Sequence, residues 1–214
     1  MNIFRILGDL SHLTSIIILL HTINTNKSTT GISLKTQILY VIVFITRYLD
    51  LFTKFISVYN TLMKIFFIIS SVYIVYLIQY KYSQKHMVKQ DLDNFKVEYL
   101  LLGSLLLSLI FNYKFTPLEI LWSFSLWLES VAILPQLMML TRTGEADMLT
   151  TNYIFCLGLY RAFYIPNWFY RYFAEGHFDK LAVFTGLIQT LLYSDFFYIY
   201  YKNVIQARSS KLPV

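Results

Sequence analysis

The sequence predicts an all-α integral membrane protein of seven transmembrane helices, and three observations support this fold class. Hydrophobic residues make up 57% of the 214 residues and charged residues only 14%, a composition far more apolar than that of a soluble domain. The apolar residues gather in segments of about 20, the length that an α-helix needs to cross a bilayer. The gaps between the segments are short and polar. We therefore expect a single domain over residues 1–214, in which residues 202–214 form a cytosolic tail.

Seven apolar segments account for the expected helices. The first is interrupted by Asp9 and His12 and lacks a small-x-small cleavage site, which favours a membrane helix over a cleaved signal peptide. The fourth is short, and the compact gaps favour antiparallel neighbours. In order, the segments run from Ile3 to Leu20, Thr36 to Phe55, Thr61 to Tyr80, Val97 to Tyr113, Pro117 to Leu140, Thr150 to Phe173 and Leu181 to Tyr201.

Positively charged residues predict the orientation. Most of the eighteen lysines and arginines fall in alternate gaps and in the C-terminal tail, and such loops are normally cytosolic. The N-terminus is then luminal and the C-terminus cytosolic. Because the net charge of +6 is spread over these loops, we expect no nucleic-acid partner. The residues expected on the cytosolic side are Lys27, Lys35, Lys81, Lys85, Lys89, Lys96, Arg142, Lys202, Arg208 and Lys211, whereas Lys54, Lys64, Lys114 and Lys180 are expected in luminal gaps outside the helices.

The chain also contains a weak internal repeat. "FITRYLDLF" in the second segment and "GLYRAFYIP" in the sixth both place an arginine within an apolar helix. These are the middle helices of two triplets, segments one to three and five to seven, and the fourth segment is the linker helix that makes the triplets parallel. Two such bundles with a site between them are a common plan of transporters.

Charged side chains inside the segments indicate a site. A charge within a bilayer is costly, so it needs a partner or a function. Helix periodicity and direction place one set in the luminal half, a second set near mid-membrane, and Asp195 in the cytosolic half of the last helix. The luminal set is Arg5, Arg47, Asp50, Glu119 and Arg171, and the deeper set is His12, Glu129 and Arg161.

The luminal set indicates an anionic ligand. Three arginines suit a ligand with several carboxylates, because a guanidinium binds a carboxylate through two parallel hydrogen bonds. Asp50 and Glu119 then hold a positive group of the same ligand, with Trp122 beside it for a cation–π contact. His12, in the deeper set, is a histidine, the side chain whose unperturbed pKa lies between pH 5 and 8. The site therefore has the features of a pH-gated binder.

Structural explanations compete with this interpretation. Arg161 and Glu129 can form an ion pair that only locks two helices together, and His12 can be a hydrogen-bonded residue of the bundle. Asp9 and Lys54 can simply reach the lipid headgroups. No segment contains a metal cluster, a nucleophile with a paired base or a phosphate loop, so we expect no enzyme, no cofactor and no metal.

Long blocks of the sequence resemble the KDEL receptors, the seven-helix receptors that retrieve escaped endoplasmic reticulum proteins. The resemblance is to a fungal-like member and runs from Asn2 to about Tyr201. "LPQL" is also similar to the PQ-loop and SWEET-like group, whose two three-helix bundles flank a linker helix. The resemblance implies a sorting receptor, and a SWEET-like transporter of a small anionic solute or amino acid is the alternative. The blocks are "NIFRILGDLSHL", "TRYLDLFT", "SLWLESVAILPQL", "GLYRAFYIPNWFYRYF" and "LLYSDFFYIYY".

The resemblance implies the ligand, which is a C-terminal Lys/His-Asp-Glu-Leu tail with three carboxylates and one cationic side chain. Arg47 would take the terminal carboxylate and Arg5 the glutamate. Arg171 with Trp168 would take the aspartate. The groups expected around the cationic residue are Asp50, Glu119 and Trp122, and the other pocket residues implied are Tyr48, Tyr160, Tyr164 and Asn167.

The resemblance also implies a transport cycle, with capture in the mildly acidic Golgi and release in the neutral endoplasmic reticulum. Asp195 matches a carboxylate linked to transport. The cytosolic partners would be the COPI and COPII coats, and the protein would be a multi-pass membrane protein of the endoplasmic reticulum and cis-Golgi, in contact with membrane lipid. The implied proton-sensing core is His12, Glu129, Tyr160 and Arg161.

Two positions depart from the family pattern. Lys54 stands one turn beyond Asp50, where relatives more often have a small polar residue, and this second cation is expected to disfavour lysine at the fourth-last ligand position. The tail "KNVIQARSSKLPV" lacks the paired lysines of a dilysine signal. Only Lys202, Arg208 and Lys211 are then left to contact the coats.

Overall fold

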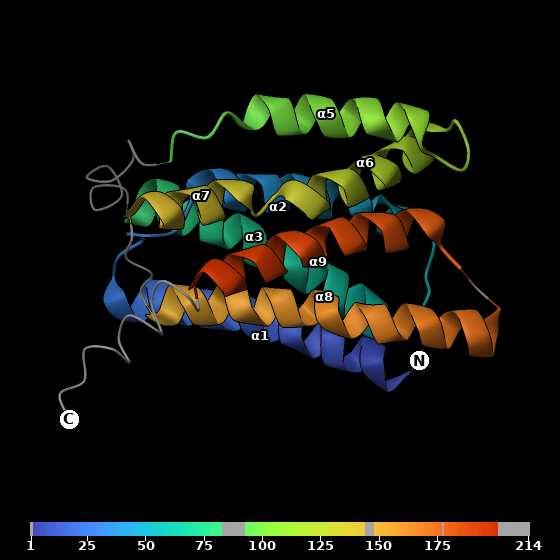
Figure 1. Cartoon of the computed structure of the whole chain (residues 1–214), viewed down its shortest axis with the longest axis horizontal. Helices are drawn as coiled ribbons and strands as arrows, with labels where there is room; N and C mark the ends of the chain where they lie inside the picture. Colours follow the sequence, from blue (N-terminus) through green and yellow to red (C-terminus); the bar gives the residue numbers. More distant parts are fainter. Residues whose placement is uncertain (1, 83–92, 144–147, 177, 201–214) are drawn as a thin grey trace.

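The computed structural model describes residues 2–82, 93–143, 148–176 and 178–200, and the regular structure of these residues is helical throughout. The helices lie side by side along the long axis of the molecule, with α5 on the outside (Figure 1). The elements are α1 (Ile3–Asn26), α2 (Leu34–Arg47), the short 3-10 helix η1 (Leu49–Phe52), α3 (Val58–Tyr76), the π-helical turn η2 (Leu77–Lys81), α5 (Val97–Ile110), α6 (Pro117–Val131), α7 (Leu134–Thr143), α8 (Met148–Glu175) and α9 (Lys180–Tyr200).

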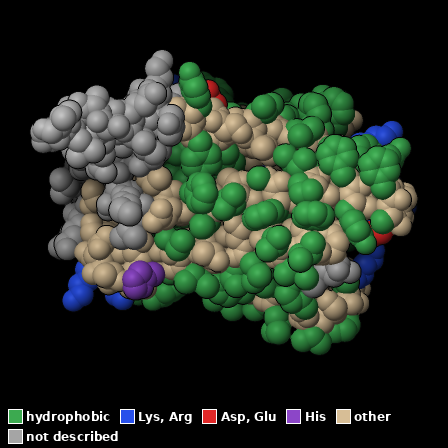
Figure 2. All heavy atoms as spheres, turned by 60° about the horizontal axis from the view of Figure 1, so that its bottom comes forward, with side chains coloured by type: hydrophobic (Ala, Val, Ile, Leu, Met, Phe, Trp, Pro, Cys, Tyr) green, Lys and Arg blue, Asp and Glu red, His purple; other side chains and the backbone are tan. Residues whose placement is uncertain are grey.

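Each of the seven predicted segments coincides with helical structure. Within the described ranges, four helical stretches are long and apolar enough to cross a membrane, and α5 is a shorter apolar helix. Figure 2 shows hydrophobic side chains spread over the flank of the molecule, with charged side chains towards its ends. The prediction of an all-α integral membrane protein is confirmed. The four stretches are Ile3–Asn26, Val58–Lys81, Pro117–Arg142 and Lys180–Tyr198.

The second helix is shorter than predicted. Tyr48 leaves the helical conformation, with φ −100° and ψ 20°, although its N–H still donates to the Phe44 carbonyl oxygen at 3.0 Å. The chain then tightens into η1, and such 3-10 turns are frequent at helix ends. The prediction of one continuous helix from Thr36 to Phe55, which would place Arg47, Asp50 and Lys54 on one face, is therefore wrong, because only Arg47 belongs to α2.

The fifth predicted helix divides into α6 and α7. Pro135 explains the break, because proline has no N–H to donate and its ring crowds the carbonyl group four residues earlier. That carbonyl belongs to Val131, the last residue of α6. Gln136 is fully buried; its N–H donates to Thr36 Oγ1 at 3.0 Å and its side-chain amide donates to the Gly31 carbonyl oxygen at 2.8 Å. The break thus ties α7 to the start of α2.

The helix contacts agree with the predicted repeat, in which α6 with α7 corresponds to α1, α8 to α2, and α9 to α3. α1 packs along α8, and α6 packs along α2. α2 packs against α3, and α8 packs against α9. α5, the expected linker, lies against α6 on the outer side of the bundle (Figure 1). Most of these contacts therefore occur in corresponding pairs, but α6 also packs against α9, and this contact has no comparable counterpart between α1 and α3 among the described residues.

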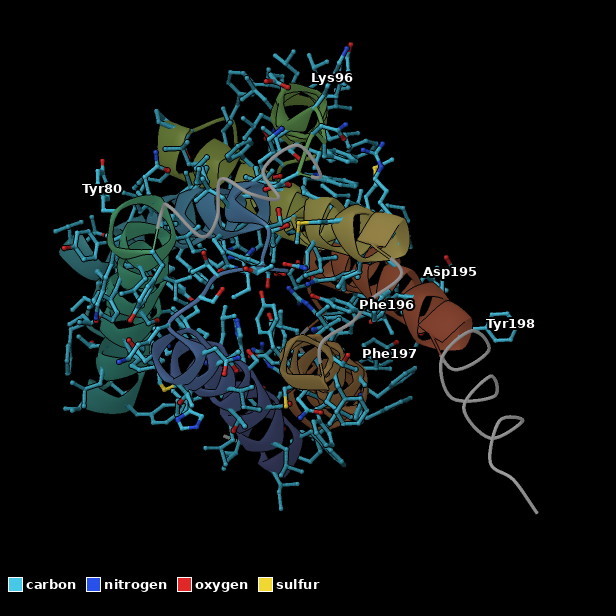
Figure 3. The ribbon with its side chains drawn as sticks, turned by 90° about the vertical axis from the view of Figure 1, so that its left-hand side faces the viewer. Tyr80, Lys96, Asp195, Phe196, Phe197 and Tyr198 are labelled. Atoms are coloured by element: carbon cyan, nitrogen blue, oxygen red, sulfur yellow. The ribbon has the colours of Figure 1, made fainter. Side chains whose placement is uncertain are left out.

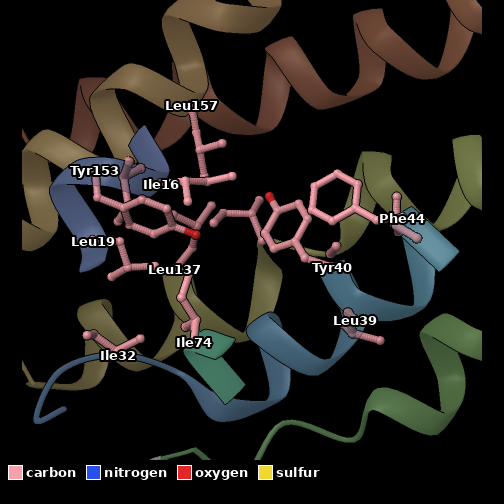
Figure 4. Close-up of a cluster of buried hydrophobic side chains, with 14 of the residues drawn as sticks. Ile16, Leu19, Ile32, Leu39, Tyr40, Phe44, Ile74, Leu137, Tyr153 and Leu157 are labelled. Atoms are coloured by element: carbon pink, nitrogen blue, oxygen red, sulfur yellow. The ribbon is translucent and has the colours of Figure 1, made fainter. Parts of the chain in front are cut away.

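A large cluster of buried hydrophobic side chains fills the end of the bundle where α1 finishes and α2 and α8 begin (Figure 4). Ile16, Leu19 and Leu39 belong to this cluster and are at most 5% exposed. Polar groups also lie at this end, where the Gln37 amide donates to the Tyr153 hydroxyl at 3.2 Å. In the predicted orientation this is the cytosolic end, so dense packing closes that end of the bundle.

Candidate functional site

A cavity of about 670 Å³ lies at the other end of the bundle, a size typical of ligand pockets. The starts of α1, α3 and α6 and the end of α2 with η1 surround it, and residues of α8 and of the α8–α9 connection complete the wall. In the predicted orientation this end is luminal. Its charged and aromatic lining residues are Arg5, Asp9, Arg47, Tyr48, Asp50, Lys54, Tyr59, Lys64, Phe67, Tyr113, Glu119, Trp122, Tyr164, Phe178 and Asp179.

A smaller pocket of about 210 Å³ adjoins the cavity and shares Arg5 and Tyr164 with it. The smaller pocket contains Arg171, so the five luminal charges do not all line one cavity. Tyr160 lines neither pocket and is buried among the helices, 6% exposed. Of the predicted ligand-binding residues, Arg5, Arg47, Tyr48, Asp50, Lys54, Glu119, Trp122 and Tyr164 line the cavity, and Asn167, Trp168 and Arg171 line the smaller pocket.

Asp9 organises the wall between the two pockets. The Tyr164 hydroxyl donates to Asp9 Oδ1 at 2.8 Å and the Tyr59 hydroxyl donates to Oδ2 at 3.1 Å. Arg5 Nε lies 3.9 Å from the same carboxylate. Gly8 allows this arrangement, because a Cβ atom at residue 8 would fall 2.8 Å from the Tyr164 ring. Asp9 therefore lines the cavity, with both carboxylate oxygens accepting hydrogen bonds from tyrosines.

Asp50 is paired across the cavity wall with Lys64. The Lys64 Nζ atom lies 2.6 Å from Asp50 Oδ2, and Lys64 is buried, 9% exposed. The prediction that Lys64 lies in a luminal gap outside the helices is wrong, because it lies inside α3. The sequence did contain a cue for this placement. A lysine inside an apolar segment needs a partner for its charge, as the intramembrane arginines do.

Glu129 joins the cavity to the deeper set of charges. Its Oε2 atom lies 2.6 Å from Arg161 Nη2 and also accepts from Arg47 Nη1. Its Oε1 atom accepts from the Tyr160 hydroxyl at 2.9 Å. Arg47 donates further to the Ser125 hydroxyl at 3.1 Å and to the Ser125 carbonyl oxygen at 2.8 Å. The expected Arg161–Glu129 pair is present, and Arg47 adds a second arginine to it.

His12 lies beside this network in an aromatic sandwich. Its ring stacks on Tyr160, with centroids 4.4 Å apart, and on Phe67, with centroids 4.5 Å apart. The side chain is buried, 6% exposed. His12 thus contacts the residue whose hydroxyl binds Glu129, which places the titratable ring next to the carboxylate that holds both arginines.

Arg171 and Trp168 line the smaller pocket from α8. Arg171 Nε lies 2.9 Å from Glu175 Oε2, and the Arg171 side chain is 35% exposed. The neighbouring Asn167 side chain accepts from the Asn2 amide at 2.8 Å, which ties α8 to the residue before α1. The Arg171 guanidinium therefore has one partner within its own helix and is open to solvent on the other side.

Asp195 lies far from both pockets, near the closed end of the bundle. Figure 3 shows Asp195 and Tyr198 on the outward side of α9, whereas Phe196 and Phe197 turn towards the bundle. Asp195 is exposed. Three residues expected to contact the coats, Lys202, Arg208 and Lys211, lie outside the described residues.

Sequence reasoning missed several polar residues of the cavity, among them Tyr59, Lys64 and Asp179. Tyr59 and Asp179 line it, and Asp179 accepts from the Tyr113 hydroxyl at 3.0 Å. Asp179 lies in a polar gap, where nothing in the sequence distinguishes a wall residue from a solvated one. Tyr59 precedes the third predicted segment, and a tyrosine at a helix end is normally an interfacial residue. Lys64 was missed because it was assigned to a gap outside the helices.

The fold and the site together define a multi-pass helical membrane protein with a charged cavity at one end, and such charges inside a membrane protein mark a functional site. A family model described as ER lumen protein retaining receptor matches residues 28–171. The chain therefore belongs to the ER lumen protein retaining receptor family.

Three relatives illustrate the match. The chain is 62% identical to the ER lumen protein-retaining receptor of Kluyveromyces lactis, over 96% of this chain and 95% of that protein. It is 59% identical to the ER lumen protein-retaining receptor of Saccharomyces cerevisiae, over 100% of both chains. It is 54% identical to ER lumen protein-retaining receptor 2 of Gallus gallus, again over 100% of both chains. The similarity thus extends over the whole sequence.

Proposed function

We propose that this protein is a sorting receptor that binds the C-terminal HDEL- or KDEL-type tails of luminal endoplasmic reticulum proteins and returns these proteins from the Golgi. The family match and the names of the full-length relatives support a receptor for retained luminal proteins. The observation that carries the proposal is the placement of Arg5, Arg47 and Arg171 in two adjoining pockets. Three guanidiniums match the three carboxylates of such a tail.

We assign the groups of the tail to the two pockets. The terminal carboxylate binds Arg47, which reaches furthest into the bundle, and the glutamate binds Arg5. The aspartate binds Arg171 beside Trp168 in the smaller pocket. The fourth-last residue meets the opposite wall, which contains Asp50, Glu119 and Trp122, while the remaining pocket residues are Tyr48, Tyr160, Tyr164 and Asn167.

The proposal includes a dependence on pH. A tail with three carboxylates brings net negative charge towards His12, and this favours the protonated imidazole. Binding then takes up a proton, so affinity rises as pH falls. The contact between His12 and Tyr160 supports a proton-sensing core formed with Glu129 and Arg161. Because affinity rises as pH falls, cargo is captured in the acidic Golgi and released in the neutral endoplasmic reticulum.

On the cytosolic side we propose contacts with the COPI and COPII coats through Lys202, Arg208 and Lys211, with Asp195 linked to transport. The membrane orientation proposed is a luminal N-terminus and a cytosolic C-terminus, which opens the cavity towards the cargo. The flank of exposed hydrophobic side chains suits contact with membrane lipid. The receptor binds and releases its cargo without chemical change, so no cofactor is required.

The transporter alternative is not favoured. The relatives that match this chain over nearly all or all of their length are named as receptors. In addition, a buried hydrophobic cluster lies beyond the cavity among the described residues, which does not favour passage of an anionic solute through the bundle. Uptake of a small anion into proteoliposomes, without any binding of peptide tails, would restore the transporter.

Binding of synthetic tails to the purified full-length protein in nanodiscs tests the proposal. A labelled peptide ending in HDEL is expected to bind saturably on the acidic side of neutrality. The same peptide with an amidated C-terminus keeps every side chain but loses the charge assigned to Arg47, and it should bind at least tenfold more weakly, since a charge-assisted hydrogen bond is worth about 1.5–3 kcal/mol. Equal binding of the acid, the amide and a scrambled tail would contradict the proposal.

A further inference from the structure

Asp50, which we assign to the fourth-last residue of the tail, already holds a cation of the protein. Lys64 Nζ lies 2.6 Å from Asp50 Oδ2, and the same ammonium lies 5.7 Å from the centroid of the Tyr48 ring. The Lys64 side chain is 11% exposed and the Asp50 side chain 37%. Lys64 is therefore a fixed part of the cavity wall, whereas the carboxylate that it binds remains open to a ligand.

Only one of the two carboxylate oxygens of Asp50 has a hydrogen-bond partner among the described residues. Oδ2 takes the ammonium, but Oδ1 is buried without a hydrogen-bond partner among the described residues. A buried acceptor without a donor is costly, so a ligand group that donates to Oδ1 is favoured. Asp50 can thus serve two donors, one from Lys64 and one from the ligand.

The charge balance at this wall follows from the same pair. Asp50 and Glu119 bring two negative charges to the cavity, and Lys64 offsets one of them directly. Lys54, which also lines the cavity, is exposed and forms no ion pair with the described residues. The wall therefore attracts a cation less strongly than its two carboxylates alone would suggest.

We propose that Lys64 is a specificity-determining residue that competes with the fourth-last residue of the tail for Asp50. The inference rests on the proposed function, because it requires a tail whose fourth-last residue reaches this wall. With Lys64 in place, a full cation gains little over a neutral hydrogen-bond donor. The receptor then selects a donor for Asp50 Oδ1 more than it selects a positive charge.

A purely structural role for Lys64 predicts a different result. If the ammonium only holds Asp50 in position, its removal releases the carboxylate, and every tail that uses Asp50 binds more weakly. Competition instead predicts that removal strengthens the binding of cationic tails relative to neutral ones. The ratio of two affinities therefore separates the explanations even when both affinities change.

The test compares peptides ending in KDEL and ADEL on the full-length protein in nanodiscs. Lys64→Met keeps the length of the side chain but removes its charge, and the KDEL-to-ADEL affinity ratio should rise, on the order of tenfold for 1.4 kcal/mol. Lys64→Arg keeps the charge and adds a planar fork that can bind both Asp50 oxygens. In this variant the ratio should fall below the wild-type value.

Two controls complete the design. Lys114→Met removes the charge of an exposed lysine that lines neither pocket, and it should leave the ratio unchanged. The double variant Lys64→Met with Asp50→Asn should lose the increase, because the gain requires the carboxylate. An unchanged or lower ratio in Lys64→Met overturns the competition. If Lys64→Met does not fold, an unchanged or higher ratio in Lys64→Arg overturns it. Failure of the folded wild type to bind any tail ending in DEL overturns the proposed function instead.

Discussion

The indole of Trp168 lies directly against Gly186, so that a Cβ atom at residue 186 would fall 2.1 Å from the Trp168 ring. Trp168 belongs to α8 and Gly186 to α9, and the contact positions the indole in the wall of the smaller pocket. Gly103 in α5 has no atom within 4 Å of the corresponding position. Gly103→Ala is therefore a suitable control for Gly186→Ala, because only the second substitution meets the Trp168 ring.

Gly186→Ala is expected to weaken tail binding by displacing Trp168. The added methyl group cannot fit beside the ring, and overpacking of this kind costs about 1–3 kcal/mol. Gly103→Ala should leave binding unchanged. Peptide affinity and thermal stability measured on both variants check this prediction, and normal affinity in a folded Gly186→Ala protein would mean that the indole has no role in the site.

Arg47→Lys is expected to reduce tail affinity strongly although the charge is kept. Lysine cannot form the two parallel hydrogen bonds of a guanidinium, and it cannot bind Glu129 and Ser125 together as Arg47 does. The expected loss is roughly 10- to 100-fold, corresponding to about 1.4–2.8 kcal/mol. Arg142→Lys, an exposed arginine at the other end of the bundle, is the matched control. Equal effects of the two substitutions on HDEL affinity would contradict the assignment of Arg47.

Tail affinity is expected to rise as pH falls through the neutral range, because binding takes up a proton. One titrating site limits the change to about tenfold per pH unit. His12→Ala should flatten the dependence if the imidazole is the sensor. Glu129→Gln should flatten it if protonation acts through the carboxylate bound to Arg47 and Arg161. Affinities measured between about pH 5 and 8 distinguish the two, and a full slope in His12→Ala excludes the histidine.

Lys54→Ser is expected to improve KDEL binding relative to HDEL binding. Lys54 lines the cavity, and its removal reduces the repulsion of a fully charged fourth-last lysine, whereas histidine is only partly charged near neutrality. A change of several-fold is reasonable for one exposed charge, which is worth about 1 kcal/mol at most. Competition between the two peptides measures the ratio directly, and an unchanged ratio shows that Lys54 points away from the ligand.

Asn26 is expected to carry no glycan although Asn26-Lys27-Ser28 is an acceptor pattern. Asn26 is the last residue of α1, at the closed end of the bundle that the predicted orientation places in the cytosol. Treatment of the native protein with a glycosidase should not change its mass. A glycan on Asn26 would reverse the orientation and turn the cavity towards the cytosol.

The helix positions were predictable because they depend on segment length and apolar composition. The division at Pro135 was also visible in principle, since proline interrupts the hydrogen bonds of a helix. The end of α2 was not predictable in this way. Arg47 is followed by seven further residues without proline or glycine up to Lys54, and the chain leaves the α-helix at Tyr48 without such a signal.

Many residues of the candidate site were predictable from the sequence, but the ion pairs between them were not. Periodicity placed Arg5 and Arg47 at one end of the bundle, and both line the cavity. It could not show that Arg47 reaches across to Glu129 on α6, because that contact depends on how two distant helices pack. The pairing of Lys64 with Asp50 was missed for the same reason, together with the assignment of Lys64 to a loop.

The closed end of the bundle has a consequence for what can enter the cavity. Among the described residues, the hydrophobic cluster around Ile16 and Leu39 closes the bundle beyond the cavity, so a polypeptide that enters through the mouth of the cavity leaves through the same mouth. A chain that continued beyond the signal would have to double back inside about 670 Å³, whereas a chain that stops there needs room for one strand only. In the proposed receptor, a cavity of this shape favours a retrieval signal at the end of a polypeptide over the same four residues within a longer chain.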